Sequence, residues 1–338
     1  MSPINNHQVR LAARPAGLPQ ASDWDIVEEP VPTPGPGEFV VAISHISLDP
    51  AMRGWMNAGA SYIDPVEIGA VMRAGAVGRV IASEHPEFAV GEHVYSAFGV
   101  QEYALSNGAG VMKVDPSLAP LPTYLGTLGM TGMTAYFGLL DVGKPREGDT
   151  VVVSGAAGAV GSIAGQIAKI KGARAIGIAG GEEKCRWIVE ELGFDAAIDY
   201  KTQDVRAALR ETAPKGVDVY FDNVGGEILD AVLTRLARGA RIVICGAVSQ
   251  YNNAEGMRGP ANYMALLVAR ASMTGMVVFD YAARYGEAAA EIAGWMREGR
   301  LISREDVVEG GVSAFPEALL KLFRGENIGK LVLRLGSD

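Results

Sequence analysis

The segment between residues 151 and 169 has the residue types and spacing of a phosphate-binding turn. Residues 151–161 read VVVSGAAGAVG, and an amphipathic helical pattern continues to Lys169. A strand, a tight turn and a helix in this order gather backbone N–H groups and a helix N-terminus at one point, which attracts an anion. Gly158 would let the backbone approach a pyrophosphate, and Gly161 would let the helix pack closely on the strand. The first of the usual three glycines is replaced by Ala156, so a plain strand–turn–helix is the alternative interpretation.

The end of the next expected strand indicates which dinucleotide this turn would bind. An NAD site carries an acidic residue there, about 20 residues after the turn, to bind the ribose 2′-hydroxyl. The chain instead has Gly180 and Gly181 at this place, followed by a helical pattern that contains Lys184 and Arg186. A missing acid and nearby cations suit a 2′-phosphate, and Lys184 is the better candidate because it falls in the first helical turn. The alternative is that both cations belong to a solvated helix face.

Composition limits the class of protein. The chain has 338 residues, enough for two domains, and a formal net charge of −9 that argues against nucleic acid or an anionic membrane as a partner. No apolar run reaches the roughly 18 residues of a spanning helix, and the N-terminus lacks the pattern of a signal peptide. Two cysteines and four histidines without close ligand spacing indicate a metal-free protein. These features predict a cytoplasmic enzyme or binding protein.

The elements that must position the turn change in type near residue 125. Up to about Leu125 the pattern is all-β, with a proline-rich surface connection over 30–37. Beyond a helix expected over 128–140, strands and helices alternate, which predicts a doubly wound parallel sheet. Strands are expected at 151–154, 174–179, 196–199, 217–221, 241–245 and 273–278, with helices starting near residues 159, 182, 204, 226 and 260. After a helix over 282–299, strand patterns at 307–308 and 330–335 are expected to rejoin the first domain.

Four residues of reactive type are expected to be structural. Cys185 falls in a helix and Cys245 in a buried strand, where a thiol usually acts as a small apolar group. Asp49 and Arg53 stand at helical i, i+4 spacing, which predicts an ion pair between them.

Seven short motifs in order carry a resemblance to a known family. They are LDPAMRG (48–54), GAVG (75–78), QEY (101–103), GMTAY (132–136), AAGAVG (156–161), FDNVGG (221–226) and GENIGK (325–330). With them the chain resembles the medium-chain dehydrogenase/reductase superfamily, in its zinc-free branch of NADPH-dependent alkenal and prostaglandin (leukotriene B4 12-hydroxydehydrogenase-like) reductases. One departure is Thr131, where the family commonly has a proline.

The resemblance implies an α/β fold of two domains. A GroES-like β-barrel catalytic domain would comprise residues 1–125 and 301–338, and a doubly wound Rossmann domain that binds NADP would comprise residues 126–300. The family places its site in the cleft between the two domains. It also implies a homodimer, often formed by pairing the sheet edges of two Rossmann domains, and here the strand expected at 273–278 would be that edge.

The resemblance also assigns cofactor contacts. Lys184 and Tyr200 would bind the 2′-phosphate end of NADPH, and Asn223 and Asn327 the nicotinamide half. The complete set of expected NADP(H) contacts is Thr134, Gly158, Ala159, Val160, Lys184, Tyr200, Asn223, Gly246, Phe279 and Asn327.

The family reaction transfers a hydride to the β-carbon of a small-molecule α,β-unsaturated aldehyde or ketone. The enolate oxygen that develops needs a hydrogen-bond donor, and a tyrosine hydroxyl or a cofactor ribose hydroxyl must supply it. Tyr251 and Tyr62 match family positions that line the cleft, and the alternative for each is a packed aromatic. The resemblance thus predicts a 2-alkenal or 2-enone reductase. An NADPH:quinone oxidoreductase and a non-catalytic NADPH-binding protein are the alternatives.

Overall fold

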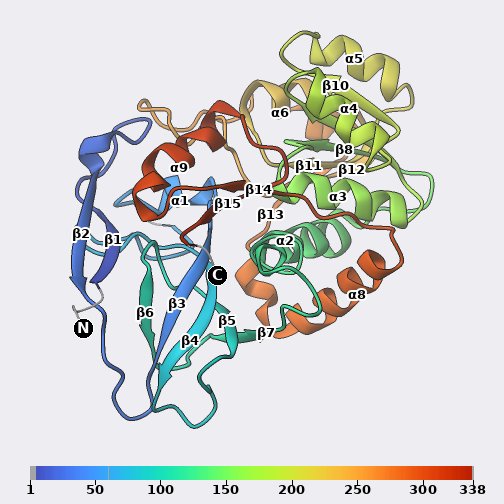
Figure 1. Ribbon diagram of the computed structural model, residues 1–338. Helices are drawn as coiled ribbons and strands as arrows, with labels where there is room; N and C mark the ends of the chain where they lie inside the picture. The colour runs from blue at the N-terminus through green and yellow to red at the C-terminus, as the bar shows by residue number, and fades with distance from the viewer. Residues whose placement is uncertain (1–4, 60, 337–338) are drawn as a thin grey trace. The chain divides into compact units, whose positions relative to one another are not determined.

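A computed structural model describes residues 5–59 and 61–336, which form two compact units (Figure 1). The first unit combines the described residues up to Gly126 with those from Glu305 onward. The second unit is the continuous segment Thr127–Arg304. The chain therefore leaves the first unit once and returns to it.

The second unit is built on a six-stranded parallel sheet. Its strands are β8 (Thr150–Ser154), β9 (Arg174–Ala179), β10 (Ala196–Asp199), β11 (Val217–Asp222), β12 (Leu236–Ile244) and β13 (Ser272–Gly275). They lie in the order β10-β9-β8-β11-β12-β13, so the order reverses between β8 and β11. This is the doubly wound Rossmann order, in which ligands bind at the carboxyl ends of the strands beside the reversal. The expected α/β fold class is confirmed.

Helices cover both faces of this sheet. One face carries α3 (Ala159–Ile170) and α4 (Glu182–Glu190), and the other carries α5 (Val205–Thr212), α6 (Gly226–Leu233) and α7 (Ala265–Ala269). On α3 pack α2 (Met130–Phe137) and the π-helical turn η3 (Gly138–Gly143), and the 3-10 helix η4 (Val278–Arg284) and α8 (Tyr285–Arg297) pack on α2. The central strands β8 and β9 are buried runs rich in Val, Ile and Ala, as expected for a parallel sheet covered on both faces, whereas the edge strand β13 is mostly exposed.

The first unit is mainly antiparallel. A seven-stranded sheet runs β14 (Glu305–Val308), β15 (Lys330–Arg334), β3 (Phe39–Ser47), β4 (Ala76–Ser83), β5 (His93–Ser96) and β7 (Met112–Val114), with β6 (Tyr103–Ser106) paired to β3. A hairpin of β1 (Asn5–Leu11) and β2 (Trp24–Pro30) lies beside it. Short helical segments complete the unit: η1 (Ala21–Asp23), α1 (Ala51–Trp55), η2 (Leu121–Leu125), η5 (Val312–Ala314) and α9 (Phe315–Arg324). The proline-rich stretch after β2 is a connection without helix or strand, as expected.

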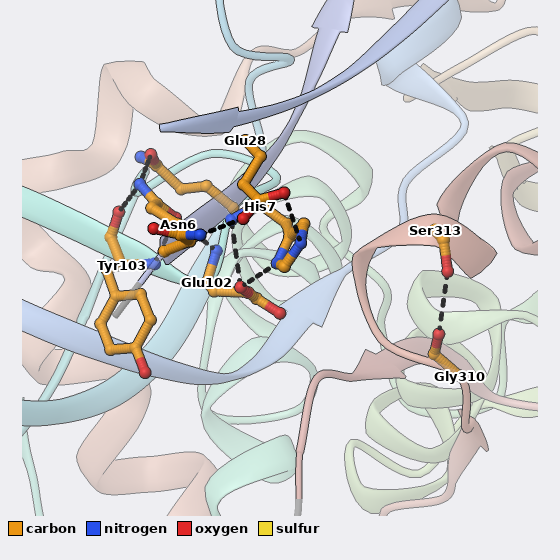
Figure 2. Close-up of polar contacts among 9 residues, drawn as sticks. Asn6, His7, Glu28, Glu102, Tyr103, Gly310 and Ser313 are labelled. Carbon is orange, nitrogen blue, oxygen red and sulfur yellow. Dashed lines mark hydrogen bonds and ion pairs between the residues drawn. The ribbon is translucent and has the colours of Figure 1, made fainter. Parts of the chain in front are cut away.

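Polar side chains attach the hairpin to the start of β6 and the residue before it, as Figure 2 shows. The buried Asn6 donates to the carbonyl oxygen of Tyr103 over 2.8 Å and accepts from the Tyr103 N–H over 2.9 Å. His7 Nδ1 lies 2.7 Å from a carboxylate oxygen of Glu102, and its Nε2 lies 3.8 Å from Glu28. The hydrogen bond and the charge of Glu102 raise the pKa of His7 above its usual value of 6.5. This contact is therefore sensitive to pH.

The prediction of an ion pair between Asp49 and Arg53 is wrong. Asp49 precedes the helix that contains Arg53, and its carboxylate pairs with Lys330 at 2.9 Å, with both side chains nearly fully buried. Lys330 also donates to a backbone carbonyl oxygen over 2.7 Å. Arg53 donates to the carbonyl oxygens of Gly17 and Pro15, each over 2.9 Å. Two of the motifs quoted above, nearly 300 residues apart, are thus joined by a buried charge pair.

Three expected boundaries are also wrong. The strand expected at 273–278 ends at Gly275. Strand β13 is the last of the sheet order and pairs only with β12, and this pairing ends where Ile244 lies opposite Gly275. The helix expected near Pro260 begins only at Ala265, because the carboxylate of Asp230 accepts the N–H groups of residues 261 and 262 and holds a turn there. Cys245 follows β12 instead of lying in it, and is half-buried.

Candidate active site

The turn from β8 into α3 has a shape that only glycine permits at two positions. Gly155 adopts a positive φ of +58°, so it supplies the left-handed residue that the sequence lacks at Ala156. A Cβ on Gly161 would lie 2.2 Å from the carbonyl oxygen of Gly155, which no side chain tolerates. Gly161 therefore lets α3 approach the turn closely, as the sequence predicted. A Cβ on Gly158 would lie 3.2 Å from the same oxygen.

The N-terminus of α3 can receive an anion. Gly158 is the N-cap residue and has no side chain with which to bind the first N–H groups of the helix. Gly158, Ala159 and Val160 are half-buried, whereas the eight residues that follow them are buried. The first turn of a helix directs its N–H groups and its dipole toward a bound phosphate. The residues present therefore fit the pyrophosphate of a dinucleotide.

Asn223 lies beside this turn, at the carboxyl end of the neighbouring strand. Its side-chain amide donates to the carbonyl oxygen of Ser154 over 2.7 Å, and its backbone N–H donates to the Ser154 hydroxyl over 2.9 Å. A Cβ on Gly155 would come within 3.4 Å of the Asn223 side chain. The structure thus brings Asn223 to the strand-order reversal, where Rossmann folds bind their ligands.

A buried carboxylate, Asp222, organises the same strand end. Its Oδ1 accepts hydrogen bonds from the Ser154 hydroxyl at 2.9 Å, the Tyr220 hydroxyl at 2.8 Å and the N–H groups of Val224 and Gly225 at 3.0 and 2.9 Å. Within residues 5–59 and 61–336, its Oδ2 has no hydrogen-bond partner. Burial, and then the charge of Asp222, raise the pKa of Tyr220 well above its usual value. Four donors on one oxygen fix the turn that carries Asn223.

Tyr251 and Gly246 lie at the carboxyl end of the next strand, β12. The Gly246 N–H donates to the Asp222 carbonyl oxygen over 3.1 Å, which ties this loop to β11. The Tyr251 hydroxyl accepts a 3.0 Å hydrogen bond from the Ala247 N–H. A Cβ on Gly246 would lie 2.9 Å from that hydroxyl, so the glycine leaves room for the tyrosine. Burial raises the pKa of the adjacent Cys245 thiol to about 12.

Lys184 and Tyr200 lie at the other side of the turn, near the ends of β9 and β10. Gly181 caps α4, and Lys184 is the third residue of that helix and half-buried. The Tyr200 ring packs on Gly180, where a Cβ would approach its atoms to 2.8 Å. The Tyr200 N–H donates to the Ala179 carbonyl oxygen over 3.1 Å. The two residues expected at the 2′-phosphate thus belong to one unit: Lys184 lies in the first turn of α4, and Tyr200 lies in the loop after β10.

The remaining expected site residues are divided between the two units. In the second unit, Thr134 donates to the Met130 carbonyl oxygen over 2.7 Å within α2, and Phe279 lies in η4 with 43% of its surface exposed. In the first unit, Tyr62 is 55% exposed and accepts from the indole N–H of Trp55 over 3.3 Å. The Asn327 side chain, also in the first unit, donates to the Gly329 carbonyl oxygen over 2.9 Å.

The sequence interpretation missed three polar residues that hold this edge in place: Ser154, Asp199 and Asp222. Each follows a run of apolar strand residues, so each stands where a parallel strand ends and a ligand edge begins. This position at the end of an apolar run was the signal in the sequence that could have identified the three residues. Their hydrogen-bond partners come from other strands and could not be read from the sequence.

Two further findings concern metal binding and membrane-spanning helices among the described residues. Among them, no group of three or more His, Cys, Asp or Glu side chains is placed to hold a metal ion. A membrane-crossing helix needs a length and an apolarity that none of the helices in the described ranges reaches.

A Rossmann sheet with a glycine turn at its strand-order reversal, in a chain with a second, antiparallel unit, is the architecture of a dinucleotide-dependent dehydrogenase or reductase. Comparison with known families supports this class of protein. Residues 7–114 match the family described as the N-terminal domain of oxidoreductase, and residues 159–294 match the family described as zinc-binding dehydrogenase.

Individual relatives match along nearly the whole chain. The NADPH-dependent curcumin reductase of Escherichia coli (strain K12) is 41% identical over 338 residues, 98% of each chain. The 2-alkenal reductase (NADP(+)-dependent) of Nicotiana tabacum is 39% identical over 342 residues, 99% of each. The crystal structure of CurA in complex with NADPH from Vibrio vulnificus superposes with a TM-score of 0.93 at 45% identity, covering 98% of this chain and 100% of that one.

The chain belongs to the zinc-free branch of the medium-chain dehydrogenase/reductase superfamily, a branch of NADP-dependent oxidoreductases. The resemblance described from the sequence, the expected enzyme class and the expected cofactor, NADP(H), are confirmed. The roles of individual residues stay predictions.

Proposed function

We propose that this protein uses NADPH to reduce the C=C double bond of α,β-unsaturated aldehydes and ketones, with hydride transfer to the β-carbon. The observation that carries the proposal is that Asn223 and Tyr251 follow the carboxyl ends of the neighbouring strands β11 and β12, beside the glycine turn, with Asp222 tied to both loops. A relative of this chain with matching length is named a 2-alkenal reductase, which supports the substrate class.

The cofactor is held by the second unit in this proposal. The N–H groups of Ala159 and Val160 bind the pyrophosphate, because that helix N-terminus is half-buried and uncapped, and Gly158, whose own N–H donates to the Gly155 carbonyl oxygen over 2.9 Å, lets the backbone approach it. Lys184 and Tyr200 bind the 2′-phosphate. Thr134, Asn223, Gly246, Phe279 and Asn327 are the proposed contacts of the nicotinamide half and its surroundings. When bound, NADPH supplies the hydride, and the protein orients it.

Tyr251 is the proposed donor to the enolate oxygen. The Ala247 N–H donates to the Tyr251 hydroxyl oxygen, so this contact occupies an acceptor position of the hydroxyl. A hydroxyl that accepts one hydrogen bond is a stronger donor in the next, because chains of hydrogen bonds polarise one another. The same contact fixes the direction of the phenol. Tyr62 is the second proposed donor, on the first unit.

The test compares cofactors and substrates directly. The absorbance of reduced nicotinamide is followed with NADPH or NADH against a medium-chain 2-enone, a 2-alkenal and a simple quinone. Oxidation of NADPH by the enone or alkenal, with little oxidation of NADH, supports the proposal. Activity with the quinone alone would make the protein a quinone oxidoreductase. Tight NADPH binding without turnover of any of the three would make it a non-catalytic binding protein.

A homodimer is also proposed, through the exposed edge of the second unit's sheet. Strand β13 ends the sheet order, and the helix α7 presents Leu267 and Val268 with 69% and 75% of their surface exposed. An open strand edge and exposed apolar side chains favour association with a second copy. Light scattering after gel filtration should give a dimer mass. Val268→Glu should shift it to a monomer, whereas Leu118→Glu, on an 80% exposed residue of the first unit, should not.

A further inference from the structure

The carboxylate of Asp199, at the end of β10, joins two loops of the second unit. Its Oδ1 accepts the Gly181 N–H over 2.8 Å and the Lys201 N–H over 3.0 Å. Its Oδ2 accepts the Thr202 hydroxyl over 2.9 Å. Gly181 belongs to the loop after β9, and the other two donors belong to the loop after β10. The Asp199 side chain therefore links these loops, together with the bond from the Tyr200 N–H to the Ala179 carbonyl oxygen.

These two loops position the proposed 2′-phosphate ligands: the first leads into α4, which carries Lys184, and the second contains Tyr200. Gly181 caps α4, so its position determines where Lys184, in the first turn, is presented. Tyr200 follows Asp199 directly, and its ring packs against Gly180. The spacing between the Lys184 ammonium and the Tyr200 hydroxyl therefore depends on the Asp199 contacts.

The residue does not replace the ribose-binding acid of an NAD site. That acid needs carboxylate oxygens that face the ribose, whereas both oxygens of Asp199 are already bound by the protein. Partial burial acts to raise the pKa of Asp199, but the hydrogen bonds from Gly181, Lys201 and Thr202 outweigh it and keep the pKa below its usual value. The group is thus a negative charge close to a proposed phosphate site, which by charge alone would disfavour NADPH.

We propose that Asp199 is a positioning residue for the choice of NADPH over NADH: it holds Gly181 and Tyr200 so that Lys184 and Tyr200 meet the 2′-phosphate. This inference rests on the proposed roles of Lys184 and Tyr200. Its geometric contribution to NADPH binding exceeds the electrostatic repulsion that its charge exerts.

Two variants separate position from charge. Asp199→Asn keeps the Oδ1 acceptor and removes the charge, and Asp199→Glu keeps the charge and displaces the acceptors by one methylene. The dissociation constants of NADPH and NADH for the purified protein without substrate are measured by titration calorimetry. Asp199→Glu should weaken NADPH about tenfold, as expected for losing a hydrogen bond to a charged group, and leave NADH within twofold. Asp199→Asn should bind NADPH at least as tightly as the unmodified protein.

A matched control uses the other end of the same strand. Asp195 precedes β10 and accepts hydrogen bonds from the Lys169 ammonium and the Ala175 N–H. Asp195→Asn makes the same change in charge away from the ligand edge and should leave the ratio of the two dissociation constants unchanged.

The opposite pattern would overturn the inference. If Asp199→Glu binds NADPH like the unmodified protein, or if it weakens NADPH and NADH equally, Asp199 does not position the 2′-phosphate ligands. The variant Lys184→Ala shows whether such a result disproves only the role of Asp199 or the proposed 2′-phosphate site itself. If Lys184→Ala leaves the preference for NADPH intact, the proposed 2′-phosphate ligands are wrong. If Lys184→Ala removes that preference while Asp199→Glu does not, only the role of Asp199 is wrong.

Discussion

Substitution of Gly161 by alanine tests the packing of α3 on the glycine turn. The new Cβ would lie 2.2 Å from the Gly155 carbonyl oxygen and 2.9 Å from the Ala156 Cα, whereas real Cβ contacts below 3.0 Å are essentially absent. The partners are backbone atoms, so the N-terminal turn of the helix must move by about 0.8 Å. The movement displaces the N–H groups proposed to bind the pyrophosphate.

The expected magnitude follows from two opposing effects. Overpacking against backbone costs about 3 kcal/mol, and alanine gains about 1 kcal/mol over glycine in a helix interior. The net loss in unfolding free energy is therefore about 2 kcal/mol. At about 2–4 °C per kcal/mol for a unit of this size, Gly161→Ala should lower the Tm by about 4–8 °C. It should also weaken NADPH binding in a calorimetric titration.

Gly294 provides a matched control for the same chemical change. It lies within α8, in the last turn before Arg297, and a Cβ there meets no atom within 4 Å. Gly294→Ala should therefore raise the unfolding free energy by about 1 kcal/mol, with NADPH binding unchanged. The reasoning is refuted if Gly161→Ala melts at or above the unmodified protein and binds NADPH equally well.

Three further changes have defined outcomes. Lys330→Ala leaves the charge of Asp49 buried without its partner, so it should lower the unfolding free energy by about 3–5 kcal/mol in urea titrations, and a loss below 1 kcal/mol would contradict a buried ion pair. The raised pKa of His7 means that its contact with Glu102 stabilises the fold at pH values below the unfolded pKa of about 6.5 and is lost as the pH rises through the folded pKa. The difference in Tm between the unmodified protein and His7→Gln should therefore shrink from acid to alkaline pH, and a difference that grows would reverse the assignment. Tyr251→Phe should lower kcat with enone while leaving the NADPH dissociation constant nearly unchanged, and an unchanged kcat would remove the hydroxyl from the mechanism.

Local patterns predicted the parallel sheet well. The strands β9 and β10 have the residue ranges expected from the sequence, because each is a short apolar run closed by residues that leave the sheet. The glycine turn was also recognisable, although its left-handed residue is Gly155 and not the position of Ala156. The prediction that the last strand of this sheet continues to Val278 was wrong, because β-branched residues favour a strand only where a neighbouring strand continues beside them.

Long-range partners could not be predicted from spacing. Asp49 and Arg53 suggested a pair because helical neighbours four residues apart meet, but the helix begins after Asp49. The partner of Asp49, Lys330, lies in the last strand of the chain. The same limit applies to Asp199, whose contacts link two loops that are adjacent only because β9 and β10 pair.

The division of the first unit into two chain segments has a consequence for the order of folding during synthesis. Strand β15 lies between β14 and β3 in the sheet, and its Leu331 and Leu333 are buried in the same core as β3. A ribosome would therefore release the whole of the Rossmann unit before the other unit receives the strand that closes its core. Until then the end of β3 at residues 45–47 lacks its partner strand and the core lacks Leu331 and Leu333, which leaves the kind of surface that chaperones bind. The continuous unit can complete its sheet without waiting for the end of the chain.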